Sequence, residues 1–210
     1  MKRLSLLLVM IFTICMSWAT IDEYYSFNAT TGTYTPITGT AVTDMLSDDA
    51  LSAAVPLGFS FPYGDNSYTE VVLSSNGWIG LGTSQTSSNL SNNLASTSYA
   101  PILAPLWDDT SMASGTAEYT MTGTAPNRIF TIQYSNLMWN YSGTAGYNFQ
   151  VNLYETGKIT FAYGSNPGAP NSPSASIGIN MLPGGAGWYF SVTPGAPASA
   201  STTTHNGAIT

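Results

Sequence analysis

Cysteine, histidine and basic residues are almost absent from this 210-residue sequence. It holds one cysteine (Cys15), one histidine (His205) and four basic residues against eleven acidic ones. Disulfide frameworks and zinc sites built on several cysteine or histidine ligands are therefore excluded. We also expect no nucleic-acid partner and no membrane contact beyond export, since so few cations cannot neutralise many phosphates.

Long apolar runs are missing too, with one exception at the N-terminus. Lys2 and Arg3 precede an apolar run from Leu4 to Met16, as in a secretory signal peptide. The run is shorter than the roughly 20 residues that a membrane-spanning helix needs. Small residues in the Ser-Trp-Ala sequence at 17–19 suit cleavage, so residues 1–19 are predicted to be a signal peptide. The protein is then expected to be secreted or held at the cell surface.

Cleavage after residue 19 would change the chemistry of the chain. It would remove Cys15, leaving a cysteine-free chain without disulfides or thiolate chemistry. It would also remove two of the four basic residues, leaving only Arg128 and Lys158 on an acidic chain. The remaining length of the chain is sufficient for one domain with its own core.

Short β-rich runs, separated by Gly, Pro, Asn and Ser clusters, make up the rest of the chain. Apolar and polar residues alternate from Tyr147 to Tyr154, so one face of this strand should be buried and the other wet. A returning strand is predicted at 159–163, and Glu155 and Lys158 are expected to pair across the turn between them. Asn76-Gly77 predicts a second hairpin, because both residues tolerate positive φ.

The same pattern predicts further strands and two loops. The strands are expected at 57–63, 102–107, 117–122, 128–134, 175–180 and 188–192, and the loops at 83–98 and 164–173. About ten strands without helices predict an all-β fold, an antiparallel two-layer β-sandwich, with a barrel-like sandwich as the alternative.

One sandwich domain is predicted to span residues 20–193. The Ala/Ser/Thr-rich segment 194–210 is either a tail or linker, truncated at Thr210, or one last edge strand. It has neither a cap nor a sorting signal, so we expect the chain to be part of a larger multidomain protein.

Four motifs in order carry a resemblance to a known family. Residues 55–64 hold a Pro-x-Gly-Phe-x-Phe pattern, 71–79 an Asn-Gly-aromatic hairpin, 100–109 an Ala-Pro-x-Trp-Asp-Asp strand, and 149–159 a Phe-Gln-Val-x-Leu hairpin, with 175–179 after it. Together they resemble the nidogen-like extracellular β domain, as found in large bacterial secreted and surface proteins. The resemblance implies an all-β module of matrix, adhesive and surface proteins, without enzymatic activity and without an established set of binding residues.

Asp108 and Asp109 are the most suggestive acidic pair. At the end of a strand they could bind Ca²⁺, the one cofactor that we consider, with Asn or backbone oxygens completing the six or more ligands required. The alternative is structural, because neighbouring residues of a strand point to opposite faces. A second acidic cluster, Asp44, Asp48 and Asp49, is interpreted as a solvated loop.

Trp139, Asn140 and Tyr141 are the candidate ligand-binding residues. Exposed aromatic rings stack on sugars, and Asn binds hydroxyl groups, so a glycan is one possible partner and an extracellular protein the other. The alternative is that the tryptophans fill the space between the two sheets: Trp78, Trp107, Trp139 and Trp188. We expect at least three of these to be core residues, and Trp139 to be the one at the surface.

Catalysis lacks its usual parts in this sequence. The single histidine lies in the unpatterned C-terminal tail, so a histidine-based catalytic triad lacks its parts. Glu155 lies at a hairpin turn, where a carboxyl group stays hydrated, which is a poor place for a catalytic acid. We therefore expect no enzyme and no catalytic residues. The leading hypothesis is a noncatalytic extracellular module for adhesion or for matrix and surface assembly; the alternative is a carbohydrate-binding module attached to a secreted hydrolase.

Overall fold

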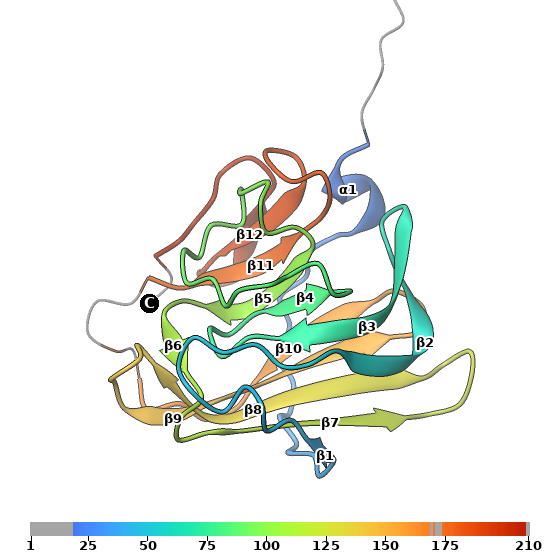
Figure 1. Cartoon of the computed structure of the whole chain (residues 1–210). Helices are drawn as coiled ribbons and strands as arrows, with labels where there is room; N and C mark the ends of the chain where they lie inside the picture. Colours follow the sequence, from blue (N-terminus) through green and yellow to red (C-terminus); the bar gives the residue numbers. More distant parts are fainter. Residues whose placement is uncertain (1–18, 169, 171–173, 209–210) are drawn as a thin grey trace, which may run out of the picture.

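The structure, a computed structural model, describes residues 19–168, 170 and 174–208. The predicted signal peptide, Ala19 excepted, lies outside the described residues, as does Cys15. Within these residues, thirteen strands form two antiparallel sheets that pack face to face (Figure 1), which confirms the predicted all-β sandwich. The helix α1 (Ile21–Tyr24) has four residues, and no helix in the described ranges is long and apolar enough to cross a membrane.

The first sheet has the order β1-β7-β8-β9-β10, and β6 also pairs with β8. Its strands are β1 (Thr40–Ala41), β6 (Thr110–Ser111), β7 (Thr116–Thr122), β8 (Ile129–Trp139), β9 (Ala145–Tyr154) and β10 (Ile159–Tyr163). The second sheet has the order β13-β12-β11-β5-β4-β3-β2. Its strands are β2 (Val55–Tyr63), β3 (Asn66–Leu73), β4 (Ile79–Leu81), β5 (Ile102–Trp107), β11 (Ser176–Asn180), β12 (Tyr189–Thr193) and β13 (Ser199–Ser201).

Both predicted hairpins are present. β9 and β10 form the predicted antiparallel hairpin, with Leu153 opposite Ile159. β3 and β4 pair around Asn76-Gly77, with Leu73 opposite Ile79. Strands β1, β6 and β13, each of two or three residues, are additional, and β13 lies within 194–210, so part of that segment is an edge strand.

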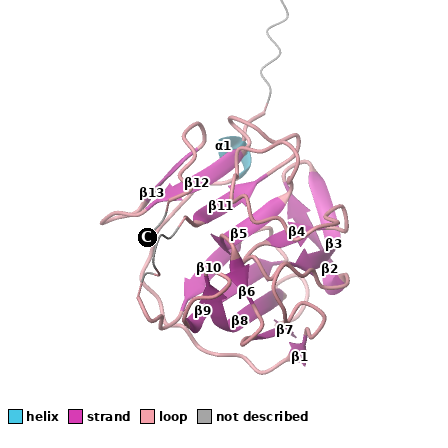
Figure 2. Ribbon diagram, turned by 60° about the vertical axis from the view of Figure 1, so that its left-hand side comes forward, coloured by secondary structure: helices cyan, strands magenta, loops and turns pink. Residues whose placement is uncertain are grey.

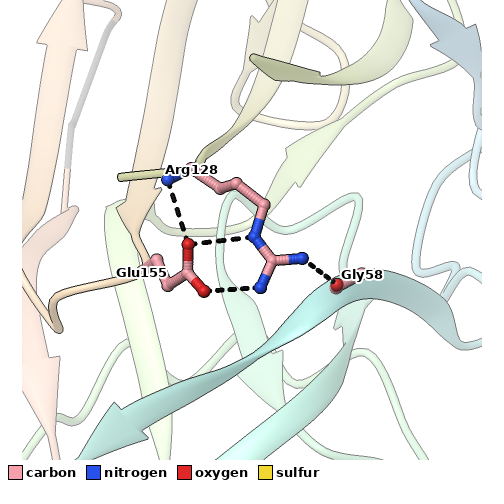
Figure 3. A network of polar contacts seen from close by, with 3 residues as sticks. All are labelled: Gly58, Arg128 and Glu155. Carbon is pink, nitrogen blue, oxygen red and sulfur yellow. Dashed lines mark hydrogen bonds and ion pairs between the residues drawn. The ribbon is translucent and has the colours of Figure 1, made fainter. Parts of the chain in front are cut away.

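The predicted pair of Glu155 and Lys158 is wrong, because Glu155 binds Arg128 instead. The Arg128 guanidinium makes two hydrogen bonds to this carboxylate, and its Nη1 donates to the Gly58 carbonyl of β2 at 2.8 Å (Figure 3). The guanidinium also lies over the Phe59 ring, 5.3 Å from its centroid. Arg128 therefore links the two sheets, which explains the lowered pKa of Glu155, whose ionised form it stabilises by hydrogen bonding.

The alternation in β9 predicted that its outer face is exposed to solvent. In the structure, part of the outer face of β8 and β9 is buried instead. Gln133 and Gln150 point outward yet are buried, because the segment 34–37 crosses over them. Gln150 Nε2 donates to the Thr35 carbonyl at 2.7 Å, and the Ile37 N–H donates to Gln133 Oε1 at 2.9 Å. The N-terminal segment thus runs from α1 across the side of the sandwich to β1.

The protein has two hydrophobic cores. The larger lies between the sheets, and a second covers the outer face of the second sheet beneath the loop 82–99. Neighbouring residues of β5 alternate between them: Leu103 belongs to the first and Ala104 to the second. Trp78 and Trp107 are core residues as expected, but they lie in the second core and not between the two sheets.

Candidate functional site

Asp108 follows β5 directly and is buried, with 7% of its surface exposed. Its carboxylate accepts hydrogen bonds from the Trp139 indole at 2.8 Å and from the Ser174 N–H at 3.0 Å. The Ser174 hydroxyl and the Asp109 N–H donate to its other oxygen. Four protein donors thus occupy the two oxygens, and this arrangement favours the structural interpretation of Asp108 over metal binding.

Trp139 is 6% exposed, so the expectation that it lies at the surface is wrong. The reason is its polar partner: Asp108 accepts its N–H, which allows the ring to be buried against Tyr147, with centroids 5.4 Å apart. Tyr141 is exposed, and Asn140 occupies the turn after β8 with a φ of 69°. Of the three candidate ligand residues, only Asn140 and Tyr141 are therefore accessible.

Asp109 lies beside Asp48 and Asp49, residues that the sequence placed in a separate loop. Oxygens from the three carboxylates lie within 4.8 Å of one another. The bridge between Asp48 and Ser111 of β6 brings the two segments together. The Asn76 side chain orients Asp49 by donating to its Oδ1 at 2.7 Å. The interpretation of Asp48 and Asp49 as a solvated loop is thus incomplete, because this loop forms a cluster with Asp109.

The negative charges of the three carboxylates in this cluster repel one another. Partial burial raises the pKa of Asp109, and the negative charges of Asp48, Asp49 and Asp108 raise it further. Burial and Asp49 likewise raise the pKa of Asp48. A divalent cation would relieve this repulsion, but three carboxylates that bind through one oxygen each supply three of the six or more ligands that Ca²⁺ takes.

Changing Asp109 to Asn is expected to stabilise the domain at pH 7, raising Tm by roughly 1–3 °C. Its raised pKa means that the folded state binds a proton more tightly than the unfolded state does. The cost is therefore complete at neutral pH, above the raised pKa, and disappears as the pH falls below the ordinary value of 3.8. Melting curves at pH 7 and pH 3 test this, with the exposed Glu23→Gln as a charge-matched control. A loss of stability at pH 7 would contradict the expected repulsion.

The open side of the sandwich is a second candidate site. Strand β10 ends the first sheet, while β11, β12 and β13 continue the second sheet beyond it (Figure 2). A hollow of about 340 Å³ lies along β10, and the segment 25–30 forms its outer wall. Its apolar lining is only half-buried and comes from β10, β11 and β12: Ile159, Phe161, Ile177, Ile179, Phe190 and Val192.

This hollow continues at both ends. A neighbouring hollow shares Tyr25 and Ile159 with it, and another shares Tyr163 and Ile177. We call the three together the β10 groove. The residues that line its central hollow are uncharged, and Lys158 at one end is the one charged residue among those lining the three hollows. The groove can therefore bind apolar side chains, a capacity that sequence reasoning missed.

His205 lies against the second sheet rather than in a free tail. Its Nε2 is 2.9 Å from the Ser176 hydroxyl and 2.9 Å from the Asn92 carbonyl. Burial lowers the pKa of His205 and so favours the neutral imidazole. Ser176 is fully buried and also donates to Asn92, so this serine–histidine contact attaches the C-terminal segment to the sheet and leaves substrate no access to the hydroxyl.

Comparison with known families identifies a related domain family. A family model described as NIDO related matches residues 24–210, which include the C-terminal edge strand. No curated protein and no solved structure shows a significant match. The match confirms the resemblance inferred from the four sequence motifs.

Proposed function

Because the chain belongs to the NIDO-related family, an extracellular type of module, we propose that it is a noncatalytic part of a secreted or cell-surface protein, used in adhesion or surface assembly. The β10 groove is the observation that carries this proposal. Hollows lined mainly by apolar side chains are where soluble domains commonly bind ligands and partner segments. Here the surface lies at the open side of the sandwich, next to the core between the sheets.

An aspartate in the groove wall should release the protein from extracellular material. Phe27 lines the groove and is 38% exposed, so Phe27→Asp places a charge there without disturbing the core. Met121 on β7 is 47% exposed and outside the groove, which makes Met121→Asp the matched control. The full chain is expressed in its source cells, and its surface-bound and free fractions are measured.

We expect wild type and Met121→Asp to be retained at the surface, and Phe27→Asp to appear largely in the medium. Equal partitioning of all three proteins would contradict the proposal, as would a wild-type protein that is entirely free and monomeric. Thermal melting of the purified variants checks that both fold.

A carbohydrate-binding module attached to a secreted hydrolase is the second candidate. A hollow of about 330 Å³ after β8 is lined by Asn140, Ser142 and Thr144, with the Tyr147 ring at its side. The exposed Tyr141 is nearby in sequence, and amide, hydroxyl and aromatic groups are those that bind sugars. Glycan binding that Tyr141→Ala removes, together with unchanged partitioning of Phe27→Asp, would favour this candidate.

A further inference from the structure

Strand β10 ends the first sheet, so one of its edges pairs with β9 and the other pairs with no strand of the described residues. The Tyr154 N–H donates to the Lys158 carbonyl, and the Gly164 N–H donates to the Asn148 carbonyl, both across the pair of β10 with β9. In an antiparallel pair the bonded residues alternate. Thr160 and Ala162 therefore also bond to β9. The residues that alternate with them direct their backbone N–H and C=O away from β9: Ile159, Phe161 and Tyr163.

These outward backbone groups are free within the described part of the chain. Their only strand neighbour is β9, and the segment 26–33 runs past them without a hydrogen bond to β10. That segment is fixed at its two ends, where the Tyr25 hydroxyl contacts the Pro62 carbonyl and the Tyr34 hydroxyl donates to Gln133. An unpaired strand edge is a template for another strand.

The same three residues of β10 face the interior. Opposite them on β9 are Leu153, Val151 and Phe149, all buried between the sheets. Below the free edge lie half-buried apolar residues of β11 and β12: Ile177, Ile179, Phe190 and Val192. A strand added to β10 would therefore bond along its backbone and place every second side chain over this apolar surface.

We propose that the β10 groove binds an extended peptide segment of a partner protein, which adds to the first sheet as a further strand. The inference rests on the proposed function, for which it names the partner. The segment has apolar residues at alternate positions, because the central hollow is lined by uncharged and mainly apolar residues. It has no acidic residues, because the chain itself carries eleven acidic residues against four basic ones and would repel them.

A second copy of the chain is a poorer occupant than a partner peptide. The alternating apolar segments of the described residues are already strands within the two sheets. The free segment nearest the groove, 26–33, contains Gly32 and only two apolar residues, Phe27 and Ala29. It would also have to leave its two anchors in order to reach another molecule.

The probe is a synthetic peptide, acetyl-Lys-Thr-Val-Thr-Ile-Thr-Val-Thr-Lys-amide, and calorimetry measures its binding to the full chain. We expect saturable binding to wild type. Methylating the peptide nitrogens on one alternating set should abolish binding, and methylating the other set should not, because only one edge of an added strand faces β10. Hydrogen exchange should slow at Ile159, Phe161 and Tyr163 when the peptide is bound.

A matched pair of variants tests the backbone of β10 itself. Ile159→Pro removes an outward N–H that β9 does not use, at an edge position where proline is tolerated. Ile159→Ala shortens the same side chain and keeps the N–H. We expect Ile159→Pro to bind the peptide about tenfold more weakly than Ile159→Ala, the effect of losing about one backbone hydrogen bond.

Peptide binding that tolerates methylation on both sets would overturn strand addition while leaving the proposed function intact. Absence of peptide binding would overturn it as well. A wild-type dimer whose β10 amides are protected without peptide would show that a second copy is the occupant. Failure of the proposed function is a separate result, namely unchanged surface retention of Phe27→Asp.

Discussion

Replacing Trp107 with alanine is expected to lower the free energy of unfolding by about 3–5 kcal/mol. The indole is fully buried on the outer face of the second sheet, edge-on to Trp78 and Tyr99, with centroids 6.4 and 6.1 Å away. Its N–H donates to the Asn89 carbonyl at 2.7 Å, which also accepts the Trp78 N–H at 2.9 Å. Alanine would therefore leave a cavity and loosen the loop that closes the second core.

Urea unfolding, followed by far-ultraviolet circular dichroism, measures this loss. Trp107→Phe is the control, because it keeps one aromatic ring in the core and loses the smaller ring of the indole with its N–H. We expect it to cost about 1–2 kcal/mol. If alanine costs no more than phenylalanine, the second core contributes little and the loop covers the sheet without stabilising it.

The strands could be predicted from sequence because their information is local. The alternation from Tyr147 to Tyr154 and the Asn76-Gly77 turn each determine a hairpin within a few residues, and both hairpins are present. The second core could not be predicted in this way. The loop 83–98 has a polar composition, and nothing in it indicates that Leu94 is buried or that Asn89 binds two tryptophans.

The candidate sites depend on contacts between distant parts of the chain. Asp109 could be singled out by its neighbour Asp108, but its approach to Asp48 follows from a bridge to β6. The β10 groove depends on strand order, because the apolar pattern of 159–163 is the same for a central strand and for an edge strand. A sequence pattern indicates that a face is apolar and leaves open whether another strand covers it.

Trp139 illustrates the same limit for a single side chain. Its place beside a Gly-rich turn favoured exposure, and Asn140 and Tyr141 do lie at the surface. The partner that allows the indole to be buried is Asp108, which is distant in sequence. The two sets of candidate site residues, acidic and aromatic, thus meet in one buried hydrogen bond.

Replacing Asp108 with alanine is therefore expected to cost about 2–4 kcal/mol, because it deprives buried donors of their acceptor. The Trp139 indole and both donors of Ser174 would lose their partner. The end of β5, the end of β8 and the segment before β11 would then lose the side-chain hydrogen bonds that join them at this point. Asp108→Asn keeps one carbonyl oxygen in place and should cost less.

Unfolding measured with added Ca²⁺ and with a chelator separates the two roles considered for this residue. A structural aspartate gives the same loss for Asp108→Ala in both conditions, since its partners are protein donors. A calcium ligand gives a loss that is large with Ca²⁺ and vanishes with chelator, an outcome that would overturn the structural role. Asp109→Asn, expected to stabilise, provides the comparison within the same pair: adjacent carboxylates have opposite effects because one is surrounded by donors and the other by negative charges.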